Sequence, residues 1–253
     1  MVDGQLNIEF VDLNRQYLSI KGEIDFAIQQ VIEKRAFFKG EYVERFEKNW
    51  AALYKRKHCI GVANATDGLF LVMKALGIEE NDEVIIPTNT FMATAEAVNH
   101  TGARPVFVDC DPETYNIDLN QIEARITGNT KAILPVHLYG MACNMEKIVA
   151  LAQRHGLYVI EDCAQSHLAS WKGQLTGTWG IAGVHSFYPG KNLGAYGDAG
   201  AVITDNSELA DKVRRLADHG RLSKFDHDII GYSSRLDGLQ AAVLLVKMNF
   251  LML

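Results

Sequence analysis

The sequence predicts an α/β fold in which a mostly parallel central sheet is covered by helices on both faces. Apolar runs of about four to six residues alternate with amphipathic stretches of about ten along most of the chain. The runs are apolar at successive positions, which is typical of strands buried on both faces of a parallel sheet. Ligands of such sheets bind beyond the carboxyl ends of the strands, so the residues that follow each strand are the candidates for chemistry.

Two helices are expected before the first strand. Residues 14–34 carry apolar side chains at helical spacing, and a second apolar stripe spans residues 43–53. The first strand is expected over 58–63. A helix then begins at Thr66 and is ended by Gly77, because glycine commonly follows the last residue of a helix.

The same alternation continues along the chain. Further strands are expected at 83–87, 104–108, 131–136 and 157–161, and helices at 92–100, 119–125 and 145–155. Two more apolar runs, 184–188 and 201–204, flank a glycine-rich segment, and a last helix is expected from Arg235 to the end of the chain.

The amino-acid composition limits the binding partners and the cellular location that are expected for the protein. The 253 residues are 48% hydrophobic with a net charge of -6, which argues against a nucleic-acid or anionic-membrane partner. Residues 1–10 lack the basic and apolar regions of a secretory signal, and no apolar run approaches the roughly 20 residues of a membrane helix. The four cysteines are scattered without a C-x-x-C pair. This pattern indicates reduced thiols in a cytoplasmic protein.

The end of the sequence is unusually apolar. The helix expected from Arg235 stops on five residues of which four are apolar, without a glycine cap or a polar tail. We therefore expect the chain to be a fragment cut within a helix that leads into a further domain.

One glycine-rich stretch contains a lysine at a strand exit. Residues 186–200 read S-F-Y-P-G-K-N-L-G-A-Y-G-D-A-G, and Lys191 follows the apolar run that ends at Tyr188. The glycines allow backbone to approach a ligand closely. A single lysine more often lies on a solvated surface, so its function depends on the residues at the other strand ends.

Four other residues at strand ends are candidates for ligand binding. Asp162 could be a metal ligand, a general base, the partner of a cationic ring nitrogen or a helix N-cap. Thr66 opens a helix, where free N–H groups and the helix dipole favour a phosphate, or where it is a simple cap. Phe91 could stack on a planar cofactor or pack in the core, and Ser186 could donate its hydroxyl to the phosphate.

A lysine, a carboxylate, an aromatic face and a phosphate cradle are the set that pyridoxal phosphate needs. The lysine forms a Schiff base with the aldehyde, the carboxylate keeps the pyridine nitrogen protonated, and the aromatic ring lies over the cofactor. Burial near cationic groups lowers the pKa of a lysine, which lets it act as nucleophile and proton carrier.

Eight motifs occur in order over nearly the whole chain. They are G-E-Y-V-E-R-F-E (40–47), A-T-D-G-L (65–69), D-E-V-I-I-P-T-N-T-F-M-A-T-A (82–95), G-A-R-P-V-F-V-D-C-D-P (102–112), P-V-H-L-Y-G (135–140), E-D-C-A-Q-S-H (161–167), S-F-Y-P-G-K-N-L-G (186–194) and S-R-L-D-G-L-Q-A-A (234–242). On these motifs the chain resembles the nucleotide-sugar aminotransferases of the DegT/DnrJ/StrS type, within the fold-type I pyridoxal-phosphate enzymes.

The resemblance implies a domain organisation and an activity. Residues 1–234 would form the cofactor-binding large domain with its N-terminal helices, and 235–253 would begin a helix leading to a small C-terminal domain that is missing. The family transfers an amino group, usually from L-glutamate, to a keto sugar on a nucleoside diphosphate, as in deoxysugar and lipopolysaccharide biosynthesis. It works as a homodimer with the active site at the interface.

Two details of the Lys191 motif refine this expectation. The form Y-P-G-K-N-L-G-A-Y-G-D is similar to members that act on 3-keto sugars more than to those that act on 4-keto sugars. The close relatives that dehydrate sugars have His in place of Lys191, which favours transamination.

Residue roles follow from the resemblance. Lys191 would be the internal aldimine lysine and Asp162 the partner of the pyridine nitrogen. Gln165 would hydrogen-bond the ring hydroxyl oxygen, and Phe91 would stack on the ring. The residues that would hold the phosphate are Ala65, Thr66 and Ser186.

Two positions depart from the family pattern. Ser233 replaces an Asn that reaches the phosphate across the dimer interface, and its shorter hydroxyl could make that contact through water. Leu168 replaces a common Gly, which would add bulk near the cofactor loop.

Two alternatives stay open at this point. Asp109 and Asp111 follow an apolar strand and could hold a divalent metal in a nucleotide-sugar glycosyltransferase, although the resemblance explains them as a turn. The chain could also be a truncated, non-catalytic fragment. The histidines, His137, His167 and His185 among them, show no metal-ligand spacing, so core or loop roles and no metal are expected.

Overall fold

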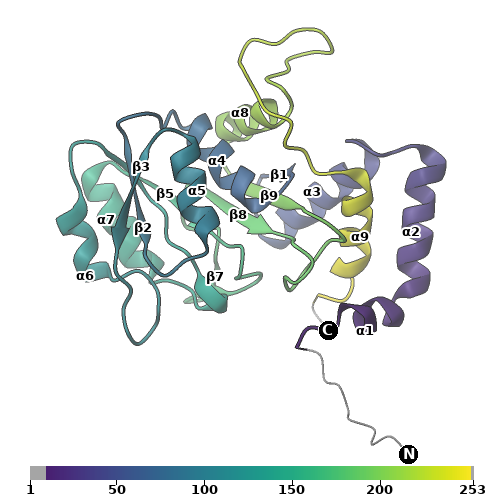
Figure 1. Ribbon diagram of the computed structural model, residues 1–253, viewed down its shortest axis with the longest axis horizontal. Helices are drawn as coiled ribbons and strands as arrows, with labels where there is room; N and C mark the ends of the chain where they lie inside the picture. Colours follow the sequence, from purple (N-terminus) through teal and green to yellow (C-terminus); the bar gives the residue numbers. More distant parts are fainter. Residues whose placement is uncertain (1–9, 252–253) are drawn as a thin grey trace, which may run out of the picture.

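The computed structural model describes residues 10–251 and is built on a seven-stranded sheet (Figure 1). Its strands are β1 (His58–Val62), β2 (Glu83–Pro87), β3 (Arg104–Val108), β4 (Thr130–Ile133), β5 (Tyr158–Asp162), β8 (Ala182–Ser186) and β9 (Gly200–Thr204). The order across the sheet is β1-β9-β8-β5-β4-β2-β3, and β9 runs in the direction opposite to the other six strands. The predicted mostly parallel sheet is confirmed, and the carboxyl ends of six strands meet at one edge.

The helices precede, connect or follow these strands. They are α1 (Leu13–Ser19), α2 (Lys21–Lys34), α3 (Glu41–Leu53), α4 (Ala65–Ala75), α5 (Met92–His100), α6 (Leu119–Ile122), α7 (Met145–His155), α8 (Ser207–Ala217) and α9 (Gly238–Met248). A small hairpin, β6 (Ser170–Trp171) with β7 (Gln174–Leu175), lies between β5 and β8.

Both faces of the sheet are covered, as predicted. On one face, α4, α5 and α8 pack against strand residues such as Val84 and Val184 in one apolar cluster. On the other face, α6 and α7 cover β4 and β5, while α3 and α9 cover β9 around Phe46 and Ile203. Helix α2 packs on α9 at the outer edge (Figure 1). Most strands are therefore shielded from water, whereas the edge strand β3 is partly exposed, at Arg104 and Phe107 among others.

Asparagine side chains begin three of the covering helices. Asn64, Asn144 and Asn206 accept hydrogen bonds from the N–H groups of residues three further on, at the starts of α4, α7 and α8. Such caps satisfy backbone donors that lack a partner within the helix. Helix α7 ends at Gly156, whose left-handed conformation favours glycine. The caps at Asn64 and Asn206 explain why α4 and α8 start directly after strand exits.

The structure differs from the sequence-based expectation in four places. The helix expected over 14–34 is broken at Ile20 into α1 and α2. Helix α8 was not expected, because its sequence is strongly charged and its apolar stripe is limited to a few residues, Leu209, Val213 and Leu216 among them. The β6–β7 hairpin was also missed. The last helix begins at Gly238 and ends at Met248, although it was expected to run to residue 253.

The expected division at residue 234 stays a prediction. Helix α9 packs against α2 and α3, and Leu244 is fully buried in the same apolar cluster as α3. Residues 1–9 and 252–253, on which the signal-peptide expectation and part of the expected last helix fall, lie outside the described residues.

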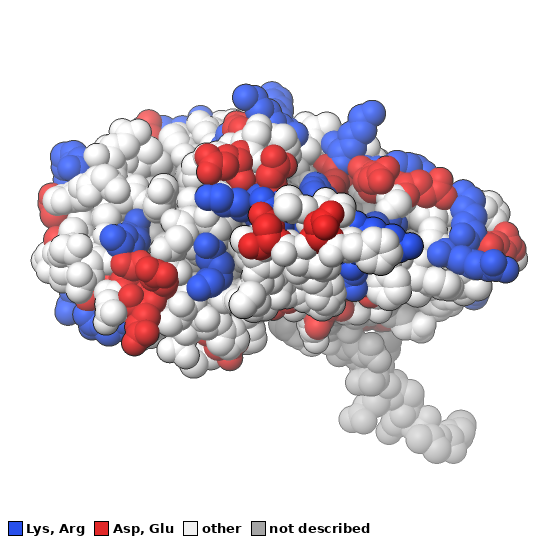
Figure 2. All heavy atoms as spheres, turned by 90° about the horizontal axis from the view of Figure 1, so that it is seen from above, with Lys and Arg blue, Asp and Glu red and all other residues white. Residues whose placement is uncertain are grey.

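Two further observations concern possible partners. Within residues 10–251, no helix combines the length and apolar character needed to cross a membrane. On the face that Figure 2 shows, acidic and basic side chains are interspersed over the surface. This mixed charge offers no single-sign field of the kind that attracts nucleic acid.

Candidate active site

A cavity of about 670 Å³ opens at the carboxyl edge of the sheet, between the ends of β1, β2, β5 and β8. Seven of the eight residues predicted as the site line it: Ala65, Thr66, Phe91, Asp162, Gln165, Ser186 and Lys191. Their side chains come from segments up to about half the chain apart in sequence. The parallel arrangement of the strands is what brings them together.

Ser233, the eighth residue, does not line this cavity. It is exposed on the long connection between α8 and α9, which extends away from the body in Figure 1. Its hydroxyl accepts a hydrogen bond of 3.4 Å from Arg235 Nη2. Its contact with a cofactor in a second copy of the chain stays a prediction.

Asp162, at the end of β5, is buried and held in one orientation. Its Oδ1 accepts from the N–H of Ala164 at 3.0 Å, and its Oδ2 accepts from Thr94 Oγ1 at 2.9 Å. Thr94 Oγ1 also lies 2.8 Å from Thr90 Oγ1. Burial raises the pKa of Asp162, although these two hydrogen bonds oppose the shift. A cation in the cavity would stabilise the charged form of the buried Asp162 carboxylate.

Lys191 is half-buried on the connection between β8 and β9. Three backbone hydrogen bonds close this connection, from Phe187 N to Ala199 O, from Ala195 N to Phe187 O, and from Lys191 N to Tyr188 O. Burial lowers the pKa of Lys191, while the charge of Asp162 opposes the shift. The fold therefore favours the neutral, nucleophilic amine more than an exposed lysine would.

The N-terminus of α4 forms the opposite wall of the cavity. The Asn64 side chain caps Asp67 N–H at 2.8 Å, and Ala65 and Thr66 form the first turn beside it. Gly200 of β9 passes against this turn so closely that a Cβ there would lie 2.5 Å from the Asn64 carbonyl carbon. A helix start held this firmly is suited to bind a phosphate.

Gln165 and Phe91 supply contacts for a planar group. Gln165 Oε1 accepts from Tyr139 N–H at 2.9 Å, which leaves its Nε2 amide to donate to a ligand. The Phe91 side chain is 73% exposed, so one ring face is open for stacking.

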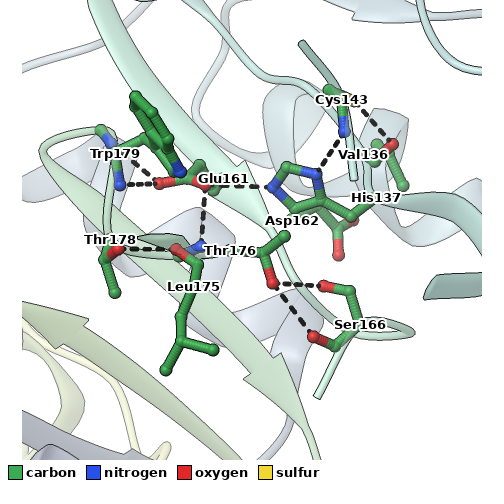
Figure 3. Close-up of polar contacts among 12 residues, drawn as sticks. Val136, His137, Cys143, Glu161, Asp162, Ser166, Leu175, Thr176, Thr178 and Trp179 are labelled. Atoms are coloured by element: carbon green, nitrogen blue, oxygen red, sulfur yellow. Dashed lines mark hydrogen bonds and ion pairs between the residues drawn. The ribbon is translucent and has the colours of Figure 1, made fainter. Parts of the chain in front are cut away.

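A hydrogen-bond network behind Asp162 centres on the fully buried Glu161 (Figure 3). Its two oxygens accept from the N–H groups of Gly177, Trp179 and Gly180 at 2.7 to 2.8 Å. The second oxygen also accepts from His137 Nε2 at 3.0 Å. The network thus ties the turn at 177–180 to the strand end that carries Asp162.

His137 is a satisfied core residue. Its Nδ1 accepts from Cys143 N–H at 3.1 Å, and this pairing assigns the ring proton to Nε2. Among residues 10–251, His137, Glu161 and Cys163 form the one group spaced closely enough for a metal. Because protein hydrogen bonds already occupy both ring nitrogens and both carboxylate oxygens, this cluster is better explained as a structural network.

Sequence reasoning missed several residues around the site. Asn64 is a readable N-cap signal in front of a helix. Thr94 lies within a quoted motif, but its contact with Asp162 needs the packing of α5 on β5. Glu161 reads as a buried strand residue, and only the structure shows the loops that it holds.

Leu168 has a different consequence from the one expected. It does not line the cavity, and its side chain packs against the cluster of α3 and α9. Its backbone φ is 60°, in the left-handed region that favours glycine. The family glycine at this position therefore suits the backbone conformation.

Asp109 and Asp111 lie away from the cavity and are engaged in a turn. Asp111 Oδ1 accepts from the N–H groups of Glu113 and Thr114 at 3.0 and 2.9 Å. This geometry agrees with the turn interpretation and gives the glycosyltransferase alternative no support.

Comparison with known proteins gives a consistent result. The model of the DegT/DnrJ/EryC1/StrS aminotransferase family matches residues 18–252. The chain is 48% identical to a protein of Geobacillus stearothermophilus named pleiotropic regulatory protein, over 96% of this chain and 65% of that protein. It is also 48% identical to the UDP-N-acetyl-3-dehydro-alpha-D-glucosamine 3-aminotransferase of Acidithiobacillus ferrooxidans, over 94% and 64%. The chain thus spans slightly less than two thirds of these relatives.

Two solved structures are similar in fold and sequence. DesV of S. venezuelae, in complex with a ketimine intermediate, has a TM-score of 0.95 and 41% identity over 98% of this chain and 67% of its own. NtdA of Bacillus subtilis, with the bound cofactor PMP, has a TM-score of 0.91 and 36% identity over 99% of this chain and 58% of its own.

Proposed function

The chain belongs to the DegT/DnrJ/EryC1/StrS aminotransferase family, and from this premise we propose that it binds pyridoxal phosphate and transfers an amino group from L-glutamate to a nucleotide-linked keto sugar. One observation carries the proposal: a lysine, a buried carboxylate, a glutamine amide, an aromatic face and a helix start line one cavity. This is the donor set that the cofactor needs.

The residues fit the parts of the cofactor. The start of α4 with Thr66 and Ser186 would hold the phosphate, and Asp162 would pair with the protonated ring nitrogen. Gln165 Nε2 would donate to the ring oxygen, and Phe91 would cover the ring. Lys191 Nζ would bind the aldehyde. The buried carboxylate supports this assignment, because burial raises its pKa and a protonated ring nitrogen beside it would offset the cost of its charge.

The cofactor supplies an aldehyde that takes up amino groups and a ring that accepts electrons. The chain's own residues do the remaining work. Lys191, whose pKa is lowered by burial, would carry the proton between the amino-acid carbon and the sugar carbon through its Nζ. Asp162 would hold the proton on the ring nitrogen, and Thr66 and Ser186 would hold the phosphate and so orient the cofactor.

We propose a ketone at the 3-position of a hexose as the acceptor. The printed name of the Acidithiobacillus ferrooxidans relative supports this choice, since it is a 3-aminotransferase of a UDP-linked 3-dehydro sugar. The Y-P-G-K-N-L-G-A-Y-G-D segment agrees with it. We also propose a homodimer in the cytoplasm, supported by the family and by four free cysteines.

The central test compares Lys191→Ala with the wild type and with Lys212→Ala, a surface control on α8. The purified chain is mixed with pyridoxal phosphate, reduced with borohydride and digested. We expect the mass of the cofactor on Lys191 in the wild type and the control, and none in Lys191→Ala. Amino transfer from glutamate is then assayed on UDP- and dTDP-linked 3-keto and 4-keto hexoses. Attachment elsewhere, or turnover retained by Lys191→Ala, would contradict the proposal.

A further inference from the structure

His167 lies beside the Lys191 segment and outside the cavity lining. Its Nε2 donates to the carbonyl oxygen of Ser186 at 3.0 Å, and its Nδ1 accepts from the N–H of Leu193 at 3.2 Å. Ser186 and Leu193 are on the two sides of Lys191 in the chain. One ring therefore holds both ends of the turn that carries the lysine.

The surroundings keep this ring neutral and in place. Trp50 meets it edge-on at 5.5 Å between ring centroids, and Phe187 lies at 5.4 Å. Burial lowers the pKa of His167 to about 4, and the nearby charge of Lys191 acts in the same direction. A neutral ring can donate at one nitrogen and accept at the other, which is what the two contacts require.

The backbone of His167 belongs to the segment that leaves β5. That segment begins at Asp162 and carries Gln165, and it is anchored by Ser166, whose carbonyl oxygen accepts from Thr176 Oγ1 at 3.0 Å (Figure 3). The ring thus bridges two segments that are far apart in the chain. One bears the carboxylate and the glutamine, and the other bears the lysine.

We propose that His167 is a positioning residue that fixes the Lys191 turn against the Asp162–Gln165 segment through its two ring nitrogens. Its consequence for the cofactor rests on the proposed function. Its consequence for the turn does not, because the hydrogen bonds are made by the protein alone. Without the ring, the Leu193 N–H and the Ser186 carbonyl lose their partners, and the turn opens more often.

Three substitutions separate the roles of the ring. His167→Phe keeps the aromatic packing and removes both hydrogen bonds. His167→Asn offers an oxygen near the place of Nδ1, and His167→Gln offers an amide nitrogen near the place of Nε2. His155→Phe is the matched control, since that ring lies at the end of α7 and contacts Glu123.

The first measurement is amide hydrogen exchange in the cofactor-free chain. We expect His167→Phe to raise the exchange of peptides within 187–197 about tenfold and to leave α7 and α8 unchanged. His167→Asn should restore protection of Leu193 better than His167→Gln does. Unchanged exchange in 187–197, or an equal rise in every peptide, would overturn the positioning role, and so would equal protection in the Asn and Gln variants.

The second measurement is the rate at which borohydride traps pyridoxal phosphate on Lys191. We expect a rate about fivefold to tenfold lower in His167→Phe, with the thermal midpoint close to that of His155→Phe. A wild-type rate in His167→Phe would refute the positioning of the lysine. If the wild type itself is not trapped on Lys191, the proposed function fails, while the exchange experiment still decides the role of His167 in the turn.

Discussion

Replacing Asp162 with Asn should raise the stability of the cofactor-free chain and lower its amino-transfer activity. Asp162 is 6% exposed, and its two oxygens accept from Ala164 N–H and Thr94 Oγ1. In Asp162→Asn, Oδ1 can keep the first bond. The new amide can donate to Thr94 Oγ1, whose own proton then turns to Thr90 Oγ1. The substitution therefore removes a charge and keeps a partner for both hydrogen-bond contacts of the side chain.

The expected change in the free energy of unfolding depends on two opposing effects, weaker hydrogen bonds and the loss of a buried charge. A hydrogen bond to a charged group contributes about 1.5–3 kcal/mol and one to a neutral group about 0.5–1.5 kcal/mol, so two weakened bonds cost about 2 kcal/mol. Burial outweighs the hydrogen bonds of Asp162, because the net direction of its pKa is upward. The cofactor-free Asp162→Asn chain should thus be more stable than the wild type at pH 8, by about 1.4 kcal/mol for each unit by which the fold raises the pKa of Asp162.

The stability difference between Asp162→Asn and the wild type should depend on pH. A carboxyl whose pKa is raised on folding holds its proton more tightly in the folded chain. The wild type therefore loses stability as pH rises from the ordinary value near about 4 through the raised pKa. The advantage of Asp162→Asn should be full above that range and should disappear as pH falls below it.

The assay is urea unfolding of the cofactor-free chain at several pH values, with Asp211→Asn on the surface of α8 as control. Amino transfer with cofactor is measured in parallel and should fall about 10²-fold or more, since the ring nitrogen loses its anionic partner. A variant less stable than the wild type at pH 8 would refute the desolvation argument. Activity within about tenfold of wild type would refute the role of Asp162.

Two further predictions test the frame around the site. Gly200→Ala places a Cβ against the backbone of Asn64, so we expect the free energy of unfolding in urea to fall by about 1–3 kcal/mol. Cofactor binding, measured by titration, should also be weaker. An unchanged affinity would contradict the close approach of Gly200 to the start of α4. Glu161→Gln puts an amide donor where three backbone N–H groups and His137 donate. The same measurement should show a free energy of unfolding lower by about 1–3 kcal/mol. An unfolding midpoint equal to that of the wild type would contradict the role of Glu161 in the network.

Much of the fold and the site was predictable because the signals are local. The strand exits and helix starts follow from apolar runs and caps, and a parallel sheet brings strand ends to one edge. For this reason Asp162, Lys191 and Thr66 could be named from the sequence and were found lining one cavity.

The remaining features depend on contacts between distant segments. No local pattern shows that His167 meets Leu193, or that Thr94 on α5 reaches Asp162 on β5. The reversed direction of β9 was also invisible, because a buried strand has the same apolar composition in either direction. The backbone φ of Leu168 explains the family glycine only once the turn is seen.

The antiparallel pairing of β8 and β9 makes the lysine segment a loop with a fixed base. Ser186 and Gly200 are direct partners across the two strands, so the two ends of 187–199 lie side by side. Away from this base, His167 accepts from the Leu193 N–H, and Lys247 Nζ of α9 donates to the Gly194 carbonyl oxygen at 2.8 Å. The position of Lys191 therefore depends on the segment after β5 and on α9 as well as on the sequence of the loop itself.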